Sequence, residues 1–285
     1  MGGWTCFGSW PELLPHGVEL MPLELPGHGS RMGDPLPYAA SMQDLARQVL
    51  DGVGRETLAA VPFALFGHSF GAWLAYEMCQ ELVRRDGWPR PLKVYVSACR
   101  APQLAGRGDD ADRECPTLGD LDSGAFWEAF ERRYGRNPDL QHEHIRGFVQ
   151  GVLQADFRLL EAYEPSTLEP LAGVPLRAVC ARGDVRCPPQ QLTAWRRVAG
   201  PGPDDFRERW FEGVLLPGGW ATEHRYVTDN PGSLLRFLAA DLPIVGDGGY
   251  DRADSGADGP LPPVDLGGAP GTGSEAERRS GCALL

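Results

Sequence analysis

The chain has 285 residues, of which 42% are hydrophobic, and a formal net charge of -12 at pH 7. The length suits one mid-sized catalytic domain, and the acidic balance argues against a nucleic-acid surface as the main role. No apolar run is long enough to span a membrane, and no signal-peptide pattern opens the chain. Seven cysteines without a C-x-x-C pair argue against a disulfide framework and a zinc site, so reduced thiols in the cytoplasm are expected.

Short apolar runs alternate with helical patterns along the chain. Between the first two runs, residues 41–53 place Met42, Leu45, Val49 and Leu50 at helical spacing. This alternation predicts an α/β fold with a mostly parallel sheet and helices on both faces. The predicted strands are residues 18–23, 63–66, 94–97 and 176–180.

The second predicted strand runs into Gly67-His68-Ser69-Phe70-Gly71, which matches G-x-S-x-G. With 37 glycines in the chain the pattern alone is weak. A strand before it and the helical residues 72–78 after it supply the context of a nucleophile elbow. The elbow predicts an α/β-hydrolase with Ser69 as nucleophile and the backbone N–H of Phe70 as one oxyanion donor.

Residues 116–163 break the alternation of short apolar runs and helical patterns, because helix is predicted along the whole segment. They lie between two predicted strands, so a helical lid over about residues 103–165 is expected. Their aromatic residues suit an acyl chain, although ordinary packing of helices on the domain explains most of the same pattern. Residues 1–242 then form the catalytic domain. Residues 243–285, rich in Gly, Pro and Asp, are predicted to be a disordered tail.

A serine nucleophile needs a base, and the base needs an orienting carboxylate. In this fold the chain order is serine, acid, histidine. Asp184 follows a predicted strand, and His224 is the single histidine after it. The chain order and the presence of a single later histidine select Asp184 as the acid and His224 as the base. The remaining histidines are interpreted as structural (His68), as surface residues of the lid (His142 and His144) or as loop residues (His16 and His28).

Several segments resemble the type II thioesterases, the free-standing α/β-hydrolases that serve fatty-acid, polyketide and nonribosomal peptide synthases. The similarity runs from the first residues to about Leu242. The segments that carry it are Gly2-Gly3 with Phe7, Trp10 and Leu13; Leu25-Pro26-Gly27-His28-Gly29-Ser30-Arg31; the elbow within residues 62–77; residues 97–102; Ala155-Asp156-Phe157-Arg158 with Glu161 and Tyr163; and Asp184 with Leu192-Thr193-Ala194-Trp195.

The resemblance implies hydrolysis of acyl groups from the phosphopantetheine arm of an acyl-carrier protein, or of acyl-CoA. It implies Ser69 as nucleophile, Asp184 as acid and His224 as base, with no metal and no cofactor. A monomer is expected. The second oxyanion N–H is expected near Met1 or Gly2.

The sequence departs from the family pattern around the base. The family places Gly-Gly directly before the catalytic histidine. Here residues 220–223 separate Gly218-Gly219 from His224, or residues 214–223 are inserted after Gly213. If these residues are a dispensable insertion, deleting 220–223 would leave activity unchanged or raise it.

Two other functions remain open at this point: a carboxylesterase or lipase acting on small esters, and a binding protein with a decayed site.

Two further features are candidates for interactions. Arg132, Arg133 and Arg136 are candidates for docking an acidic carrier, or form a solvated helix face. Cys282-Ala283-Leu284-Leu285 fits C-a-a-X, so prenylation of Cys282 and weak membrane association are weighed against a coincidental match.

Overall fold

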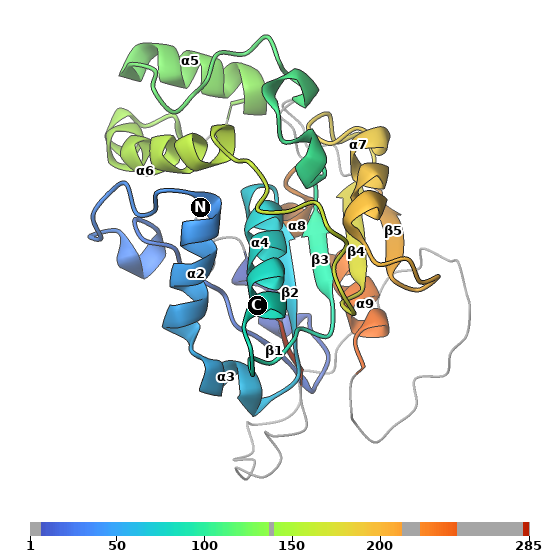
Figure 1. Ribbon diagram of the computed structural model, residues 1–285. Coiled ribbons are helices and arrows are strands. Elements are labelled where there is room, and N and C mark those ends of the chain that lie inside the picture. Colours follow the sequence, from blue (N-terminus) through green and yellow to red (C-terminus); the bar gives the residue numbers. More distant parts are fainter. Residues whose placement is uncertain (1–6, 137–139, 213–222, 244–281, 285) are drawn as a thin grey trace, which may run out of the picture.

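The computed structural model describes residues 7–136, 140–212, 223–243 and 282–284 (Figure 1). Its strands form one sheet in the order β1-β6-β2-β3-β4-β5, and every neighbouring pair is parallel. The predicted α/β-hydrolase class with a mostly parallel sheet is therefore confirmed. The strands are β1 (Val18–Leu20), β2 (Phe63–His68), β3 (Val94–Ser97), β4 (Leu176–Ala181), β5 (Phe206–Phe211) and β6 (Cys282–Leu284).

Helices cover both faces of the sheet. The sequence predicts the start of α2 well, because the Ser41 hydroxyl accepts a hydrogen bond from the backbone N–H of Asp44 and so caps the first turn. The α-helices are α2 (Met42–Val53), α3 (Arg55–Ala60), α4 (Phe70–Arg84), α5 (Ser123–Tyr134), α6 (Glu143–Glu161), α7 (Pro189–Thr193), α8 (Tyr226–Asp229) and α9 (Gly232–Asp241). Short 3-10 helices are η1 (Trp10–Glu12), η2 (Gly29–Arg31), η3 (Pro102–Leu104), η4 (Arg107–Asp109) and η6 (Ala194–Val198).

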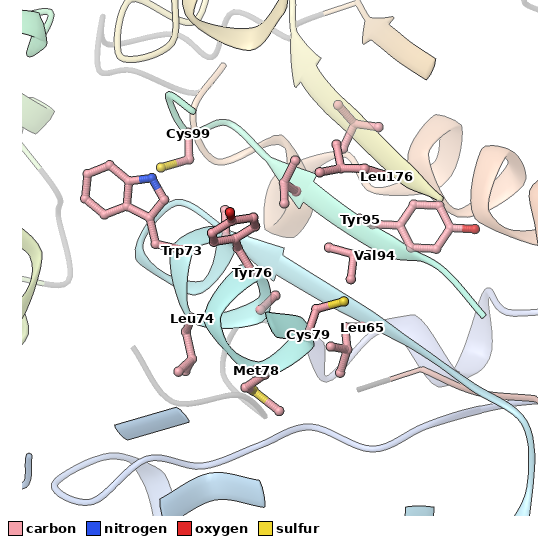
Figure 2. Close-up of a cluster of buried hydrophobic side chains, with 14 of the residues drawn as sticks. Leu65, Trp73, Leu74, Tyr76, Met78, Cys79, Val94, Tyr95, Cys99 and Leu176 are labelled. Carbon is pink, nitrogen blue, oxygen red and sulfur yellow. The ribbon is translucent and has the colours of Figure 1, made fainter. Parts of the chain in front are cut away.

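The helix α4 carries most of the core on one face of the sheet. Its side chains Trp73, Tyr76 and Cys79 are fully buried. Tyr76 and Cys79 lie toward β2 and β3, whereas Trp73 points toward Cys99, beyond the end of β3 (Figure 2). On the other face α9 covers β3, where the ring of Phe237 meets that of Tyr95 at a centroid distance of 6.3 Å. Because α4 starts directly after β2, this packing also fixes the turn between them.

In the region predicted to be helical throughout, the described residues form two α-helices, α5 and α6. Residues 116–122 are not helical, and α5 begins after Asp122, whose carboxylate accepts a hydrogen bond from the N–H of Ala125. Gly135, with φ of 77°, ends α5 because this left-handed backbone suits glycine. In Figure 1, α5 and α6 lie together beyond the N-terminal end of α4. They follow β3 and precede β4 in the chain.

The strand β6 is the largest departure from the sequence prediction, which made residues 243–285 a disordered tail. Ala283 is paired with Glu19 of β1 and with Phe63 of β2. The N–H of Met21 donates to the Leu284 carbonyl at 2.8 Å, and the N–H of Ala283 donates to the Pro62 carbonyl at 2.9 Å. Three residues of the expected tail are thus an inner strand of the sheet.

Prenylation of Cys282 is not supported by this arrangement. Cys282 is 2% exposed, and burial raises the pKa of its thiol above the ordinary value. Alkylation by a transferase requires an accessible sulfur, and the thiolate is the reactive form. Cys282 is paired with Val18 of β1 and meets neither condition. Separately, no helix of the described residues combines the length and hydropathy needed to cross a bilayer.

The contribution of β6 can be measured at Leu284, whose side chain is fully buried. We expect Leu284→Ala to lower the free energy of unfolding by about 2–5 kcal/mol, because the substitution removes apolar contacts and leaves a cavity. Urea denaturation gives this value. The matched control is Leu168→Ala, since Leu168 is 37% exposed. Equal losses in the two variants would show that β6 does not belong to the folded sheet.

Candidate active site

The elbow around Ser69 has the strained backbone of a tight strand-to-helix turn. Ser69 has φ of 53°, a conformation that residues with side chains rarely adopt. A Cβ on Gly67 would lie 1.9 Å from the carbonyl oxygen of Gly71, so the first position of the motif requires glycine. A Cβ on Gly71 would meet no atom within 4 Å, so the constraint falls on Gly67.

The turn places the Ser69 hydroxyl at the start of α4, which begins at Phe70. The first N–H groups of a helix have no acceptor within the helix and favour negative charge. The backbone N–H of Phe70 is therefore suited to bind an oxyanion at Ser69. Met1 and Gly2, the expected sources of a second donor, lie outside the described residues.

The structure brings together the three side chains selected from the sequence. His224 Nε2 lies 3.1 Å from Ser69 Oγ, and His224 Nδ1 lies 2.9 Å from Asp184 Oδ2. An ionised carboxylate only accepts, so Nδ1 carries the proton and Nε2 is free to accept one from the serine hydroxyl. This is the arrangement that a serine nucleophile and its base require. Of the two candidate insertions before His224, residues 220–223 and 214–223, all but Glu223 lie outside the described residues.

Asp184 occupies the turn after β4, where its side chain is completely buried. Burial acts to raise the pKa of this carboxyl, but His224 and the N–H of Arg186 outweigh it, and the pKa lies below its ordinary value. The Arg186 N–H donates to Oδ1 at 2.8 Å, while the thiol of Cys180 lies 3.6 Å from Oδ2. Asp184 is therefore held ionised in one orientation.

A hydrogen-bonded chain that the sequence did not predict lies beside the imidazole of His224. His68 Nδ1 lies 2.8 Å from the hydroxyl of Ser97, which lies 2.6 Å from the hydroxyl of Tyr226. This chain ties the segment carrying His224 to the end of β3 and to the elbow. The sequence feature that could have indicated this chain is the position of Tyr226, two residues after His224.

His68 also packs against His224, with ring centroids 5.0 Å apart. Burial, and next the charge of His224, lower the pKa of His68 to about 3. A neutral His68 avoids repelling an imidazolium formed at His224 during the reaction.

The lowered pKa of His68 predicts a pH dependence of stability. Because the unfolded histidine titrates near its ordinary value of 6.5, its contribution to stability is complete above that pH and is lost as the pH falls toward 3. We expect His68→Gln to flatten this decline relative to the wild type, measured as the free energy of unfolding between those pH values. Parallel curves for the two proteins would contradict the assignment.

The other histidines divide between surface and interior. His142 and His144 are exposed, as predicted. His28, interpreted from sequence as a loop residue, is buried, and its Nε2 lies 3.0 Å from Asp156 Oδ2 on α6. The hydroxyl of Tyr38 donates to the other oxygen of the same carboxylate. These contacts attach α6 to the loop that follows β1.

The arginines predicted to dock a carrier differ in their surroundings. Arg132 is exposed, and Arg136 is exposed beside Glu131. The side chain of Arg133 is only 6% exposed and lies 2.6 Å from Asp110. Arg133 is therefore not part of the predicted docking surface, because its side chain is buried and its charge is paired with Asp110.

Comparison with known proteins identifies the family of the chain. The profile of the thioesterase domain family matches residues 1–213. The chain belongs to the thioesterase family. It is therefore a hydrolase of acyl thioesters, and the resemblance drawn from the sequence is confirmed.

Individual relatives cover most of this thioesterase. The gramicidin S biosynthesis protein GrsT of Aneurinibacillus migulanus is 25% identical over 246 residues, which are 86% of each chain. Thioesterase PikA5 of Streptomyces venezuelae is 30% identical over 208 residues, covering 70% of this chain and 67% of that protein. The structure of RedJ, a thioesterase from the prodiginine biosynthetic pathway of Streptomyces coelicolor, is 31% identical with a TM-score of 0.69, over 85% of this chain and 86% of that one.

Within the described residues, no group of three or more His, Cys, Asp or Glu side chains could hold a metal ion.

Proposed function

We propose that Ser69, His224 and Asp184 form a catalytic triad that releases acyl groups from the phosphopantetheine arm of a carrier protein. The observation that carries this proposal is the hydrogen-bonded chain from Ser69 through His224 to Asp184. The relatives named for gramicidin S and prodiginine biosynthesis support a carrier of polyketide or nonribosomal peptide synthesis as the partner. The intact chain of contacts speaks against a decayed site.

The reaction proceeds by two acyl transfers. His224 Nε2 takes the proton of the Ser69 hydroxyl while Oγ attacks the thioester carbonyl, and the N–H of Phe70 stabilises the resulting oxyanion. The carbon–sulfur bond breaks, the thiol leaves with a proton from His224, and an acyl-serine remains. Water, deprotonated by the same imidazole, attacks the ester and releases the free acid. Asp184 keeps the imidazole in the required tautomer and stabilises its charge.

The direct test compares three substrates of the purified protein: a carrier loaded with an acyl-phosphopantetheine, the acyl-CoA with the same acyl group, and the matching oxygen ester of a small alcohol. We expect the carrier-bound thioester to have the highest kcat/KM and the free acid to appear with the free thiol. Faster hydrolysis of the oxygen ester would favour a carboxylesterase and contradict the proposal.

Docking of the carrier is expected to involve Arg132 and Arg136, because the chain has a net charge of -12 and must attract an acidic partner locally. Reversing both charges to glutamate should raise the KM for the carrier-bound substrate and leave that for a short synthetic thioester unchanged. The effect should weaken at high salt. The control is Arg207→Glu, which reverses an exposed charge on β5. Equal changes for both substrates would exclude docking at this surface.

A further inference from the structure

Three arginines converge on one buried carboxylate beside the proposed active site. Asp110 Oδ2 accepts from Arg133 at 2.6 Å and from Arg100 at 3.1 Å, and Oδ1 accepts from Arg186 at 2.9 Å. The arginine side chains are 6%, 12% and 8% exposed, and that of Asp110 is 9% exposed. We call these four residues the Asp110 cluster.

The Asp110 cluster holds more positive than negative charge. Burial acts to raise the pKa of Asp110, but Arg186 and Arg133 outweigh it and hold the pKa far below its usual range, so the carboxylate is ionised. Three guanidinium groups then face one carboxylate. Even when the ionised Asp184 is counted, one positive charge remains. An uncompensated charge in a protein interior is costly, so such an excess favours an anionic ligand.

The hydrogen-bonding capacity of the cluster is also incompletely used. Arg100 donates to Asp110 and to the carbonyls of Leu104 and Ala105. Among the described residues, the guanidinium groups of Arg133 and Arg186 each donate one hydrogen bond, to Asp110. The Nε of Arg133 is buried without a partner in that part of the chain. Each guanidinium has five N–H donors in a fork that matches a carboxylate or a phosphate.

Tyr134 connects the cluster to the proposed base. The guanidinium carbons of Arg186 and Arg133 lie 5.6 Å and 5.7 Å from the centroid of its ring. The same ring lies 6.3 Å from that of His224. Arg186 also holds Asp184 through its backbone N–H. The excess charge is therefore one aromatic ring away from the site of acyl transfer.

We propose that the Asp110 cluster binds an anionic group of the thioester substrate, a carboxylate or a phosphate, through Arg133 and Arg186. This inference rests on the proposed function, because it assigns a specificity site to the same reaction. The anion offsets the unbalanced charge and takes up the free donors of the two forks. A carboxylate would belong to the acyl group, and a phosphate to the thiol arm.

Two pairs of thioesters distinguish the two sources. Succinyl-N-acetylcysteamine differs from butyryl-N-acetylcysteamine by a carboxylate on the acyl group. Butyryl-phosphopantetheine differs from butyryl-pantetheine by a phosphate on the thiol arm. We expect the wild type to favour the anionic member of one pair by about tenfold or more in kcat/KM, since hydrogen bonds between charged groups are worth that much. High salt should reduce this preference.

Arg133→Gln and Arg186→Gln should each reduce the preference several-fold, and Arg186→Lys, which keeps the charge but loses the fork, should retain part of it. The matched control, Arg113→Gln, removes an exposed charge from the segment that carries Asp110 and should leave the preference intact. Equal kcat/KM within both pairs for the wild type, or a preference that the two glutamine variants retain, would overturn the inference. Failure to hydrolyse the neutral butyryl thioesters would instead contradict the proposed function.

Discussion

Replacing Ser69 by alanine is expected to reduce thioester hydrolysis to the background rate, a loss on the order of a million-fold. The physical reason is the 3.1 Å contact between Ser69 Oγ and His224 Nε2, which makes this hydroxyl the nucleophile available to the imidazole. Alanine keeps the Cβ and removes only the oxygen, so the backbone with φ of 53° tolerates it as it tolerates serine. The rate is measured by thiol release from an acyl-pantetheine.

Circular dichroism and the thermal midpoint serve as controls, and both should match the wild type. A fluorophosphonate probe should label the wild type at Ser69 and fail to label the variant. Retention of more than a few per cent of the activity in a folded variant would exclude Ser69 as the nucleophile.

The second large effect is expected at the acid. Asp184→Asn should lower kcat by about 10,000-fold, by analogy with the tautomer effect in serine proteases. The carboxylate accepts the proton of His224 Nδ1 at 2.9 Å, whereas an amide can turn its NH₂ toward the same nitrogen and favour the tautomer that protonates Nε2. A protonated Nε2 cannot accept the serine proton.

The exposed Asp51 supplies the matched control, because Asp51→Asn makes the same chemical change far from the imidazole. It should retain full activity. Near wild-type activity in Asp184→Asn, together with an essential carboxylate elsewhere, would show that the acid was assigned wrongly.

The elements that could be predicted from sequence are those with a strong local pattern. The strands β2, β3 and β4 are mostly apolar and are buried between two helical layers, so they stand out as short apolar runs. The strand β5, Phe206–Phe211, was missed because four of its residues are exposed or half-buried and three of them are charged. It lies at the edge of the sheet, where one side needs no strand partner.

The strand β6 was missed for a different reason. Its three residues follow a stretch rich in Gly, Pro and Asp, a composition typical of disorder. What fixes this strand is pairing with β1 and β2, which are distant in sequence. A short segment of this kind carries no periodicity from which a strand could be predicted.

Within the candidate site, too, some residues could be predicted from the sequence and others could not. Ser69, Asp184 and His224 were found through a motif, chain order and uniqueness. The Asp110 cluster could not be found, because Asp110, Arg133 and Arg186 come from three separate segments. No spacing in the sequence relates them, and arginine on a helix usually indicates a solvated face. Their burial depends on how the segments pack.

The position of β6 also bears on the order in which the chain folds. During synthesis β1 and β2 emerge early, while the strand that lies between them in the sheet, Cys282–Leu284, emerges only long after both. Until then the facing edges of β1 and β2 are unpaired, and exposed edges of this kind pair readily with other chains. The sheet therefore closes after translation of the domain, and pairing over so long a separation is slow. Aggregation of newly made protein should fall when a chaperone covers these edges until β6 is made.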